Sequence, residues 1–365
     1  MIMQKKLTIN DIARMAQVSK ATVSRVLNRH ASVDPVLRER VMDIVQEHNF
    51  VPNVTATELA NGRTRLIGVL APPLNWPAIP EIMHGVSEYI ETTPYEVVLY
   101  SMNLERNHSD VLDRILAMRM VSGLLAILPG GLSSHLDTFF QQGLPLVMID
   151  DQKEPTHIPW VGIDNFSSAY EATNYLLQLG HRRIAHIMGP RHYYCALQRL
   201  EGYQQALLEA GIPLEPDLLL QGEFEPASGR RCAEMLFAQD RGTWPSAIFV
   251  GNDQMAYGVL EVAEERKIQV PEAVSIIGFD DNLLSAHMRP PLTTMHQPFM
   301  EMGYQATKLL LNMIDPEHVH KPEQKWQAFS SSLPDTTKND HSSRIQIPTH
   351  LVTRTSSGAF HPRLL

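Results

Sequence analysis

The stretch that decides the fold of the N-terminal part reads Val18-Ser19-Lys20-Ala21-Thr22-Val23-Ser24-Arg25-Val26-Leu27-Asn28. Ser19 can cap a helix, and the apolar residues Val23, Val26 and Leu27 recur at helical spacing on one face. The opposite face is small, polar and cationic. A surface of this kind fits the major groove of DNA, where cations meet guanine acceptors and methyl groups meet the thymine methyl. We therefore predict a helix after Ser19 that presents a DNA-reading face.

Two further short helices are predicted on either side of this stretch. Thr8 and Asp11 have the spacing of a capping box, and the apolar stripe that follows predicts a helix up to Gln17. Asp34 followed by Pro35 is the start signal of a third helix. Together the three helices make one small core. Periodicity alone also allows a helical mini-domain whose charged face is merely solvated.

The distribution of charge separates this segment from the rest of the chain. The 365 residues carry a formal net charge of -9, which by itself argues against a nucleic-acid partner. Residues 1–65, however, hold ten Lys and Arg against six Asp and Glu, a net charge of +4, and the remainder carries -13. This asymmetry predicts a small module for a polyanion joined to a larger acidic body.

Composition excludes several classes of protein. Hydrophobic residues make up 44% of the chain and charged residues 19%, which rules out a wholly disordered or fibrous protein. Two cysteines, Cys195 and Cys232, are too few for a disulfide framework. Residues 1–10 lack the apolar core of a signal peptide, and no apolar run approaches the roughly 20 residues of a membrane helix. We expect a soluble cytoplasmic protein with no membrane partner.

Three runs of residues carry a specific resemblance: 7–13, 18–28 and 50–53. They closely resemble the lactose/galactose repressor (LacI/GalR) family, and the similarity continues through nearly the whole chain. The resemblance implies a helix-turn-helix headpiece over residues 1–51 and a hinge helix or linker over 52–65. It implies a two-lobed, periplasmic-binding-protein-like body over 66–365, in which the chain crosses between the lobes near 160, 290 and 325.

The resemblance also assigns roles to residues of the headpiece. The expected base readers are Lys20, Ala21 and Arg25. The expected phosphate or positioning contacts are Thr8, Ser19, Thr22, Ser24, Asn28 and Ser32. Gln17 stands at a turn position where the family often has Gly, so this residue should adopt a left-handed conformation at modest cost.

Residues 53–61, closed by Gly62, form the predicted hinge. They could make about two helical turns, which is too short to be stable alone in water. In the family this hinge helix folds when two subunits bind operator DNA, and its Leu wedges into a minor-groove base step. The matching residue is Leu59, with Ala56 beside it and Asn53 as the cap; a plain linker is the alternative. Glu58 departs from the small polar residue usual in the family, which could weaken or redirect the minor-groove contact.

From residue 66 onward, short apolar runs alternate with helical stripes. The predicted strands are 66–71, 96–100, 123–128, 145–149, 184–188, 247–250, 274–279 and a closing strand near 345–348. This alternation predicts doubly wound α/β lobes with parallel sheets covered on both faces. Ligands in such folds bind outside the carboxyl ends of the strands.

Polar side chains stand at these positions. Asp150, Asn252 and Asp280 each follow a predicted strand, and Arg199 lies on a helix after another. Carboxylates, an amide and a guanidinium form a good cage for a polyol, and aromatic rings cover the less polar face of a sugar. The resemblance implies an effector site made of Asp150, Arg199, Phe224, Asn252, Asp280 and Phe299. Trp76 joins this predicted site because its loop position suits stacking on a sugar. The alternative is that the Asp residues cap helices, as we expect of Asp253.

Catalytic and metal sites are not predicted. The sequence has no P-loop or G-x-S-x-G motif, and Ala71-Pro72-Pro73 would block a phosphate after the first strand. His318 and His320 are the nearest approach to a metal pair, but no further ligand stands at the right spacing. We expect no enzyme activity, no metal and no cofactor.

The C-terminal region contains residues 324–343, which resemble a loop insertion of unknown role. No leucine heptads follow residue 352, so a homodimer is the expected state.

The sequence therefore predicts a DNA-binding transcriptional regulator, a repressor, controlled by a small carbohydrate. A purine-responsive corepressor type, a sugar-binding receptor or transport component, and a sugar-metabolising enzyme are the alternatives. The basic headpiece and the missing signal peptide argue against the receptor, and the missing nucleophile argues against the enzyme.

Overall fold

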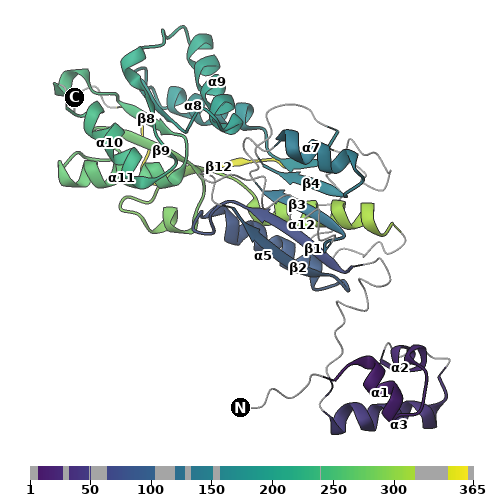
Figure 1. The fold of residues 1–365 in the computed structure, drawn as a ribbon. Helices are drawn as coiled ribbons and strands as arrows, with labels where there is room; N and C mark the ends of the chain where they lie inside the picture. The colour runs from purple at the N-terminus through teal and green to yellow at the C-terminus, as the bar shows by residue number, and fades with distance from the viewer. Residues whose placement is uncertain are drawn as a thin grey trace. The chain divides into compact units, whose positions relative to one another are not determined.

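The structure is a computed structural model, and it describes residues 7–27, 33–48, 50, 64–102, 120–127, 133–150, 157–238, 240–316 and 344–360. The chain divides into two compact units, residues 1–64 and 65–365 (Figure 1). We call them the headpiece and the body and describe each by itself. The predicted insertion at 324–343, the pair His318 and His320, and the hinge segment at 53–61 lie outside the described residues.

The headpiece contains three helices, α1 (Ile9–Met15), α2 (Lys20–Leu27) and α3 (Pro35–Glu47). The Asp11 carboxylate accepts hydrogen bonds from the Thr8 amide at 2.9 Å and from the Thr8 hydroxyl at 2.7 Å. Ser19 caps α2 by accepting from the Thr22 amide at 3.1 Å. Asp34 accepts from the amides of Val36 and Leu37 at the start of α3. The three helix starts predicted from the sequence are confirmed.

The turn between α1 and α2 is closed by Gln17, whose φ of 56° lies in the left-handed region. This confirms the expectation for a position where glycine would be unstrained. The apolar stripes of the three helices then meet in one core. Its fully buried members include Ile12 on α1, Val23 on α2 and Val41 on α3. Local caps and one small core account for this fold.

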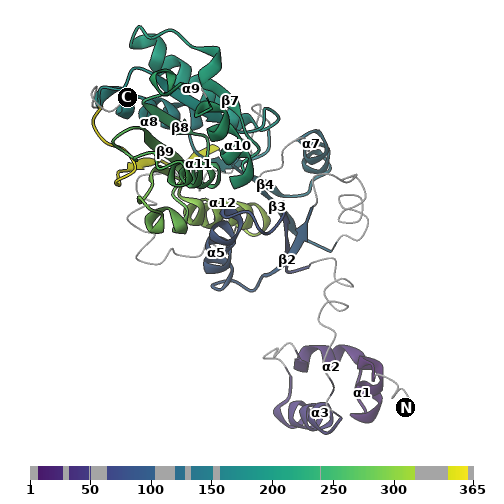
Figure 2. The same ribbon diagram turned by 90° about the vertical axis from the view of Figure 1, so that its left-hand side faces the viewer.

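The body is built on two six-stranded sheets. The first has the order β11-β5-β4-β3-β1-β2 and the second β12-β10-β9-β8-β6-β7; every pairing is parallel except the antiparallel pair of β10 with β12. We call the two halves the first and second lobes (Figures 1 and 2). The strands of the first lobe are β1 (Leu66–Ala71), β2 (Glu96–Ser101), β3 (Gly123–Ile127), β4 (Leu146–Ile149), β5 (Trp160–Gly162) and β11 (Arg344–Gln346). Those of the second are β6 (Ile184–Met188), β7 (Leu219–Gln221), β8 (Ala247–Val250), β9 (Ser275–Asp280), β10 (Thr293–His296) and β12 (His350–Val352).

Helices pack against these sheets. The first lobe has α5 (Ala78–Ile90), α7 (Ser133–Gln141) and α12 (Phe299–Ile314), and the second has α8 (Asn165–Gln178), α9 (Tyr194–Glu209), α10 (Pro226–Leu236) and α11 (Asp253–Glu265). Short 3-10 helices span Pro216–Leu218, Arg241–Thr243 and Leu283–His287.

Both faces of the first sheet are buried, which explains the continuous apolar runs. Ile67 and Val69 point to a core shared with α5 and α12, whereas Leu70 points to a second core shared with Leu136 and Phe139 of α7. Because neighbouring side chains of a strand face opposite sides, a strand covered on both sides must be apolar throughout. Among the described residues, no helix is long and apolar enough to span a membrane.

Four strands were not predicted: β5, β7, β10 and β12. Each has only three or four residues, and β10 and β12 contain polar residues such as Thr293 and His350. They are strands because a longer neighbour supplies the hydrogen bonds, not because of their own pattern.

The chain passes between the lobes three times. It does so after β5, between β10 and α12, and between β11 and β12. The third passage lies at residues 347–349, so its expected position near 325 is wrong. The reason is that Arg344–Gln346 pairs with β5 in the first lobe before the chain returns to the second. Each lobe is therefore assembled from separated segments, and residues on either side of a passage approach the space between the lobes.

Candidate functional site

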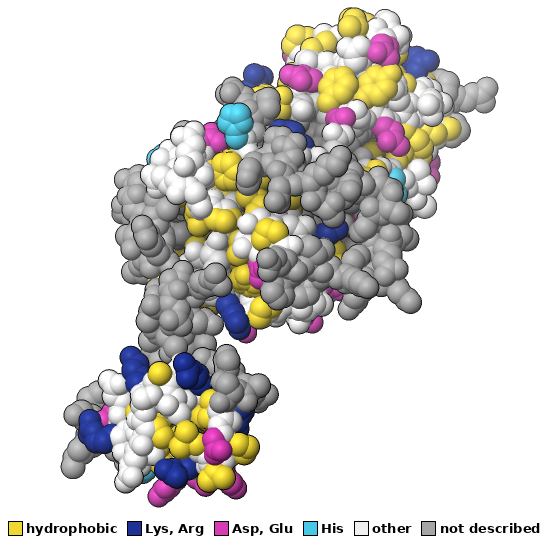
Figure 3. All heavy atoms as spheres, turned by 90° about the vertical axis from the view of Figure 1, so that its right-hand side faces the viewer, with side chains coloured by type: hydrophobic (Ala, Val, Ile, Leu, Met, Phe, Trp, Pro, Cys, Tyr) yellow, Lys and Arg dark blue, Asp and Glu magenta, His cyan; other side chains and the backbone are white. Residues whose placement is uncertain are grey.

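The DNA-reading face predicted on α2 is accessible. Lys20, Ala21 and Arg25 are exposed, and Thr22 and Ser24 are half-buried above the apolar side of the helix. Lys and Arg side chains lie around the visible face of the headpiece rather than in one patch (Figure 3). The helix thus presents small and cationic groups outward while its valines hold the core.

Three of the predicted phosphate contacts also have local partners. The Ser19 and Thr22 hydroxyls lie 2.8 Å apart, and the exposed Thr8 is bonded to Asp11. These bonds fix the helix starts, and the Thr8 hydroxyl hydrogen is already donated to Asp11. The remaining predicted contacts lie outside the described residues: Asn28, Ser32, Asn53, Ala56 and Leu59.

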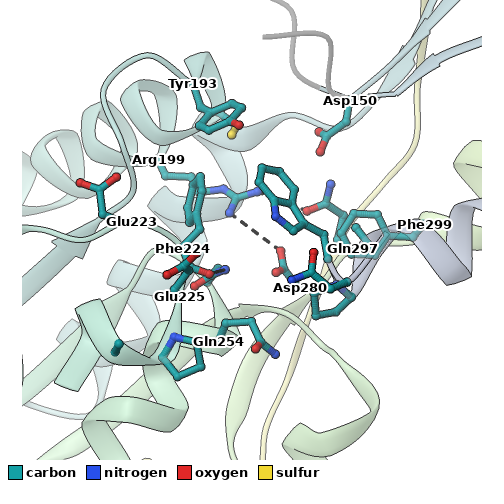
Figure 4. Close-up of a pocket in the computed structure, with 18 residues that line it drawn as sticks. Asp150, Tyr193, Arg199, Glu223, Phe224, Glu225, Gln254, Asp280, Gln297 and Phe299 are labelled. Carbon is teal, nitrogen blue, oxygen red and sulfur yellow. Dashed lines mark hydrogen bonds and ion pairs between the residues drawn. The ribbon is translucent and has the colours of Figure 1, made fainter. Parts of the chain in front are cut away.

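A cavity of about 460 Å³ lies between the lobes of the body (Figure 4). All seven predicted effector residues line it: Trp76, Asp150, Arg199, Phe224, Asn252, Asp280 and Phe299. The loop after β1, the end of β4 and the start of α12 contribute from the first lobe. The starts of α9, α10 and α11 and the ends of β7 and β9 contribute from the second. The cavity also contains residues not predicted from the sequence, among them Asn75, Tyr193, Cys195, Glu223, Glu225, Gln254 and Gln297.

Arg199 is the buried cation of the cavity, with only 3% of its surface exposed. Its Nε donates to the Asn165 side-chain oxygen at 2.9 Å, its Nη1 to the Gly251 carbonyl at 2.6 Å, and its Nη2 to the Gln297 oxygen at 3.2 Å. The guanidinium also stacks 3.6 Å from the centre of the Phe279 ring. These contacts join α8, α9, β8 and the segment after β10, so the side chain is held rigidly before any ligand arrives.

Asp280 faces this guanidinium across 3.9 Å (Figure 4). It ends β9 in a left-handed conformation, with φ of 114°, and Asp281 follows at 61°. Burial raises the pKa of Asp280 well above its usual value, while the charge of Arg199 opposes the rise. The pair offers a ligand a carboxyl group beside a cation, which suits adjacent hydroxyl groups.

The expectation that Asp253 caps a helix is wrong. Asn252 caps α11 by accepting from the Met255 amide at 3.0 Å. The Asp253 carboxylate instead accepts from the Asn282 amide at 2.8 Å, the Ser285 hydroxyl at 2.5 Å and the Thr294 hydroxyl at 2.6 Å. Burial raises its pKa to about 7. It therefore anchors the loop that carries Asp280, because the strand, loop and helix all converge on this buried carboxyl.

Backbone strain gathers at the cavity. Six non-glycine residues have a positive φ in the described part of the chain, and Asp150, Phe224 and Asp280 of these six line the cavity. Conformations of this kind cost free energy and persist where the surroundings enforce them, commonly at binding sites. The Trp160 indole, for example, donates to the Asp150 carbonyl at 2.5 Å.

Aromatic rings form one wall of the cavity. The Trp76 ring of the first lobe meets the Tyr193 ring of the second edge-on, with centroids 5.9 Å apart, and Tyr193 meets Phe224 at 5.8 Å. Tyr193 was missed because its position before α9 depends on a loop that has no sequence signature. Gln297 was missed because β10 was not recognised as a strand, although the glutamine occupies the position directly after it.

Metal and disulfide sites are not supported. Among the described residues, no group of three or more His, Cys, Asp or Glu is placed to hold a metal ion. Cys195 and Cys232 are both buried, and neither forms a disulfide. The polar and aromatic residues that line the cavity can offer hydrogen bonding and stacking.

Two family profiles match the chain. Residues 8–53 match the bacterial regulatory proteins of the lacI family, and residues 173–357 match a periplasmic binding protein-like domain. The chain is 35% identical over 303 residues to the HTH-type transcriptional regulator DegA of Bacillus subtilis, covering 82% of this chain and 88% of that protein. It is 33% identical over 314 residues to the HTH-type transcriptional repressor PurR of Aliivibrio fischeri, covering 85% and 93%. These two relatives are a transcriptional regulator and a transcriptional repressor.

Solved structures agree with this match. The Lac repressor dimer bound to operator and the anti-inducer ONPF superposes with a TM-score of 0.80 at 27% identity, covering 97% of this chain and all of that chain. A complex of the transcriptional regulator CelR with cellobiose superposes with a TM-score of 0.67 at 29% identity, covering 96% and 100%. The predicted family and fold class are confirmed: the chain belongs to the LacI family of DNA-binding transcriptional regulators.

Proposed function

We propose that this regulator is a repressor whose affinity for operator DNA is controlled by a small carbohydrate bound in the cavity between the lobes. The observation that carries the proposal is the arrangement of Arg199 and Asp280 beside the rings of Trp76 and Phe224. Paired polar groups next to aromatic faces suit a molecule whose edges carry hydroxyl groups and whose faces are less polar.

Control requires that the ligand distinguish two arrangements of the body. The cavity residues come from both lobes, so a ligand that contacts Trp76 and Phe224 together favours one spacing of the lobes over others. We propose a homodimer in which this spacing decides whether the paired hinge segments can fold on operator DNA. The ligand shifts this equilibrium only by its difference in affinity for the two arrangements.

Support for the DNA half of the proposal comes from α2 and from the family. Lys20 and Arg25 project from an exposed helix whose Ala21 leaves room for a base methyl group. The Lac repressor among the similar structures is a dimer bound to operator. We expect Leu59 to act as the minor-groove wedge.

The decisive experiment combines operator binding with ligand release. The purified full-length chain should retard promoter DNA from its own genomic neighbourhood, and a carbohydrate found by a thermal-shift screen should release it. Lys20→Ala should relax preference at one base pair by about 1–3 kcal/mol, whereas Leu59→Ser should weaken specific binding overall. If the chain failed to retard such DNA at every salt concentration, the proposal that it is a DNA-binding regulator would be contradicted. If Lys20→Ala weakened binding equally on all DNA sequences, Lys20 would be a phosphate contact and not a base reader.

Arg199 provides the test of the cavity itself. The Arg199→Gln variant should still bind operator but should lose the response to the carbohydrate, because the side chain sits where the ligand is expected. The exposed Arg231 on α10 supplies the control variant Arg231→Gln, which should respond like the natural chain. A retained response in the Arg199 variant would place the effector elsewhere.

A purine corepressor is the second candidate, because the chain is similar to the PurR repressors and because the aromatic rings that line the cavity also suit a planar base. The sign of the response separates the two. A sugar inducer lowers operator affinity, whereas hypoxanthine or guanine acting as a corepressor would raise it.

A further inference from the structure

We propose that the cavity selects against negatively charged ligands, so that its effector is an unphosphorylated molecule and not a sugar phosphate. This inference rests on the proposed function, because it takes the cavity as the effector site. It adds the charge of the ligand, which neither the fold nor the family specifies.

The charges that line the cavity are strongly unequal. Four carboxyl groups belong to Asp150, Glu223, Glu225 and Asp280, and Arg199 is the sole Lys or Arg among the described lining residues. If the buried Asp280 holds a proton, three carboxylates still face one guanidinium. A phosphate group brings up to two further negative charges, which these carboxylates repel.

The single cation is already matched within the protein. Three nitrogens of Arg199 donate to Asn165, Gly251 and Gln297, and the nearest carboxylate oxygen of Asp280 lies 3.9 Å away. A guanidinium recognises phosphate best through two parallel hydrogen bonds from one edge. Here each edge is engaged by protein oxygens, so the N–H groups that remain suit a single neutral hydroxyl.

Helix starts are the other common sites for phosphate. The starts of α5, α10 and α11 at the cavity carry residues that disfavour an anion, whereas the start of α9 at Tyr193 has no side-chain cap. Pro77 stands at the N-cap of α5 and Pro226 at the first position of α10, and proline has no N–H to donate. The N-cap of α10 is Glu225, whose charge repels an anion from the positive end of the helix dipole. In α11 the Asn252 side chain already accepts from the first-turn amide of Met255.

The two glutamates at the rim strengthen the selection. Glu223 and Glu225 are exposed on either side of Phe224, which is held in a left-handed conformation with φ of 59°. Both glutamates line the cavity beside this ring (Figure 4). Hydroxyl groups can donate to them, whereas phosphate oxygens cannot.

Cys195 allows the charge of the cavity to be measured without knowing the ligand. It lines the cavity, and replacing the other cysteine by Cys232→Ser leaves it as the single thiol of the full-length chain. Cationic and anionic methanethiosulfonate reagents of similar size would be compared, each normalised to its rate with a small free thiol. We expect the cationic reagent to be favoured by about tenfold or more, because a charged cleft changes the local concentration of ions by that order. An anionic reagent that reacts equally fast or faster would overturn the proposal.

Variants identify which carboxylates cause the preference of Cys195 for the cationic reagent. Glu223→Gln combined with Glu225→Gln should reduce the ratio of the two rates several-fold at low salt. The exposed Glu272, which does not line the cavity, supplies the control variant Glu272→Gln, whose ratio should not change. An unchanged ratio in the double variant would remove the rim glutamates from the explanation and overturn their assigned role.

Ligand pairs complete the test. Binding of ribose with ribose 5-phosphate, and of glucose with glucose 6-phosphate, would be measured by calorimetry. Wherever a pair binds, the unphosphorylated member should be at least tenfold tighter, and a tighter phosphate ester would overturn the inference. If no sugar of any kind binds or releases operator, the proposed carbohydrate effector fails, while the labelling ratio still decides the charge of the cavity.

Discussion

Arg25 on α2 and Arg199 on α9 carry the same guanidinium group in two regions with opposite designs. Arg25 is exposed on the headpiece, whereas Arg199 is 3% exposed and contacts four elements of the body. In water a guanidinium costs the fold little and is available to a polyanion. In the body the guanidinium group has lost its hydrating water, and protein oxygens must accept the hydrogen bonds instead.

The comparison teaches where each region holds its functional information. The headpiece displays charge on a surface whose shape is fixed by three caps and a small core. The body buries its charged groups, so each functional group there also contributes to the stability of the fold. A substitution in the DNA-reading face of the headpiece should therefore change function without changing the free energy of unfolding. A substitution of a buried charged group in the body should change both.

The largest effect should come from Arg199→Ala. Removing the guanidinium leaves Asp280 buried beside no cation, and breaking a buried pair in this way costs about 3–5 kcal/mol. Urea unfolding of the full chain, followed on the body transition, should show a correspondingly lower free energy of unfolding. The control Arg231→Ala removes an exposed arginine of the same lobe. A loss below about 1 kcal/mol for Arg199→Ala would show that the pair is not important for stability.

A smaller effect should appear as pH dependence through His186. The ring lies in β6 between Tyr203 and Phe249, and burial lowers its pKa from 6.5 to about 4. Between these values the unfolded chain binds a proton that the folded chain does not, so stability falls as the pH falls. The loss from this group should be about 2 kcal/mol from pH 6.5 to pH 5, at 1.4 kcal/mol per unit.

His186→Phe keeps the stacking and should remove this part of the pH dependence, which denaturant midpoints at the two pH values would show. Exposed His157 supplies the control His157→Phe, which should leave the slope unchanged. An equal slope in natural chain and His186 variant would mean that the buried ring does titrate in the folded state.

A still smaller effect is expected at a cap of the headpiece. Asp34→Ala removes the acceptor for two amides at the start of α3, which typically costs about 1 kcal/mol. Hydrogen exchange of the full chain should quicken at the amides of α3 and stay constant in the body. The exposed Glu39 in the same helix gives the control Glu39→Ala; equal quickening there would indicate general loss of helix propensity, not of the cap.

The smallest effect on stability is expected for Lys20→Ala and Arg25→Ala. Both side chains are exposed, so the free energy of unfolding should change by no more than about 0.5 kcal/mol. The same variants should alter operator preference, as stated above. A clear loss of stability from either variant would contradict the contrast between the two regions.

Much of the headpiece could be predicted because its signals are local. A cap and the amide it binds are two or three residues apart, as in Asp34 with Val36 and Leu37, so the sequence contains the whole interaction. The left-handed turn at Gln17 was predicted from the resemblance to the family, in which this position is often Gly. The long strands of the body were predicted because two buried faces require uninterrupted apolar residues.

The short strands and much of the cavity could not be predicted in this way. Residues 293–296 and 350–352 pair with each other across more than fifty residues, and no local pattern reports such a partner. Asp253 shows the same limit, because its position before a helix suggested a cap, whereas its bonds go to Asn282, Ser285 and Thr294. Glu223 and Glu225 were overlooked beside Phe224 because the sequence does not show which loop residues meet.

The sequence by itself determined the headpiece helices, the long strands of the body, the family and the residue types at the ends of those strands, since these depend on short-range periodicity and on motif spacing. The tertiary structure alone decided which of these residues share one cavity and how their charges are matched. Arg199 meets Asn165, Gly251 and Gln297 because three passages of the chain between the lobes bring distant segments together. The physical reason is that burial and hydrogen bonding act through space, where separation along the chain has no influence on contact energy.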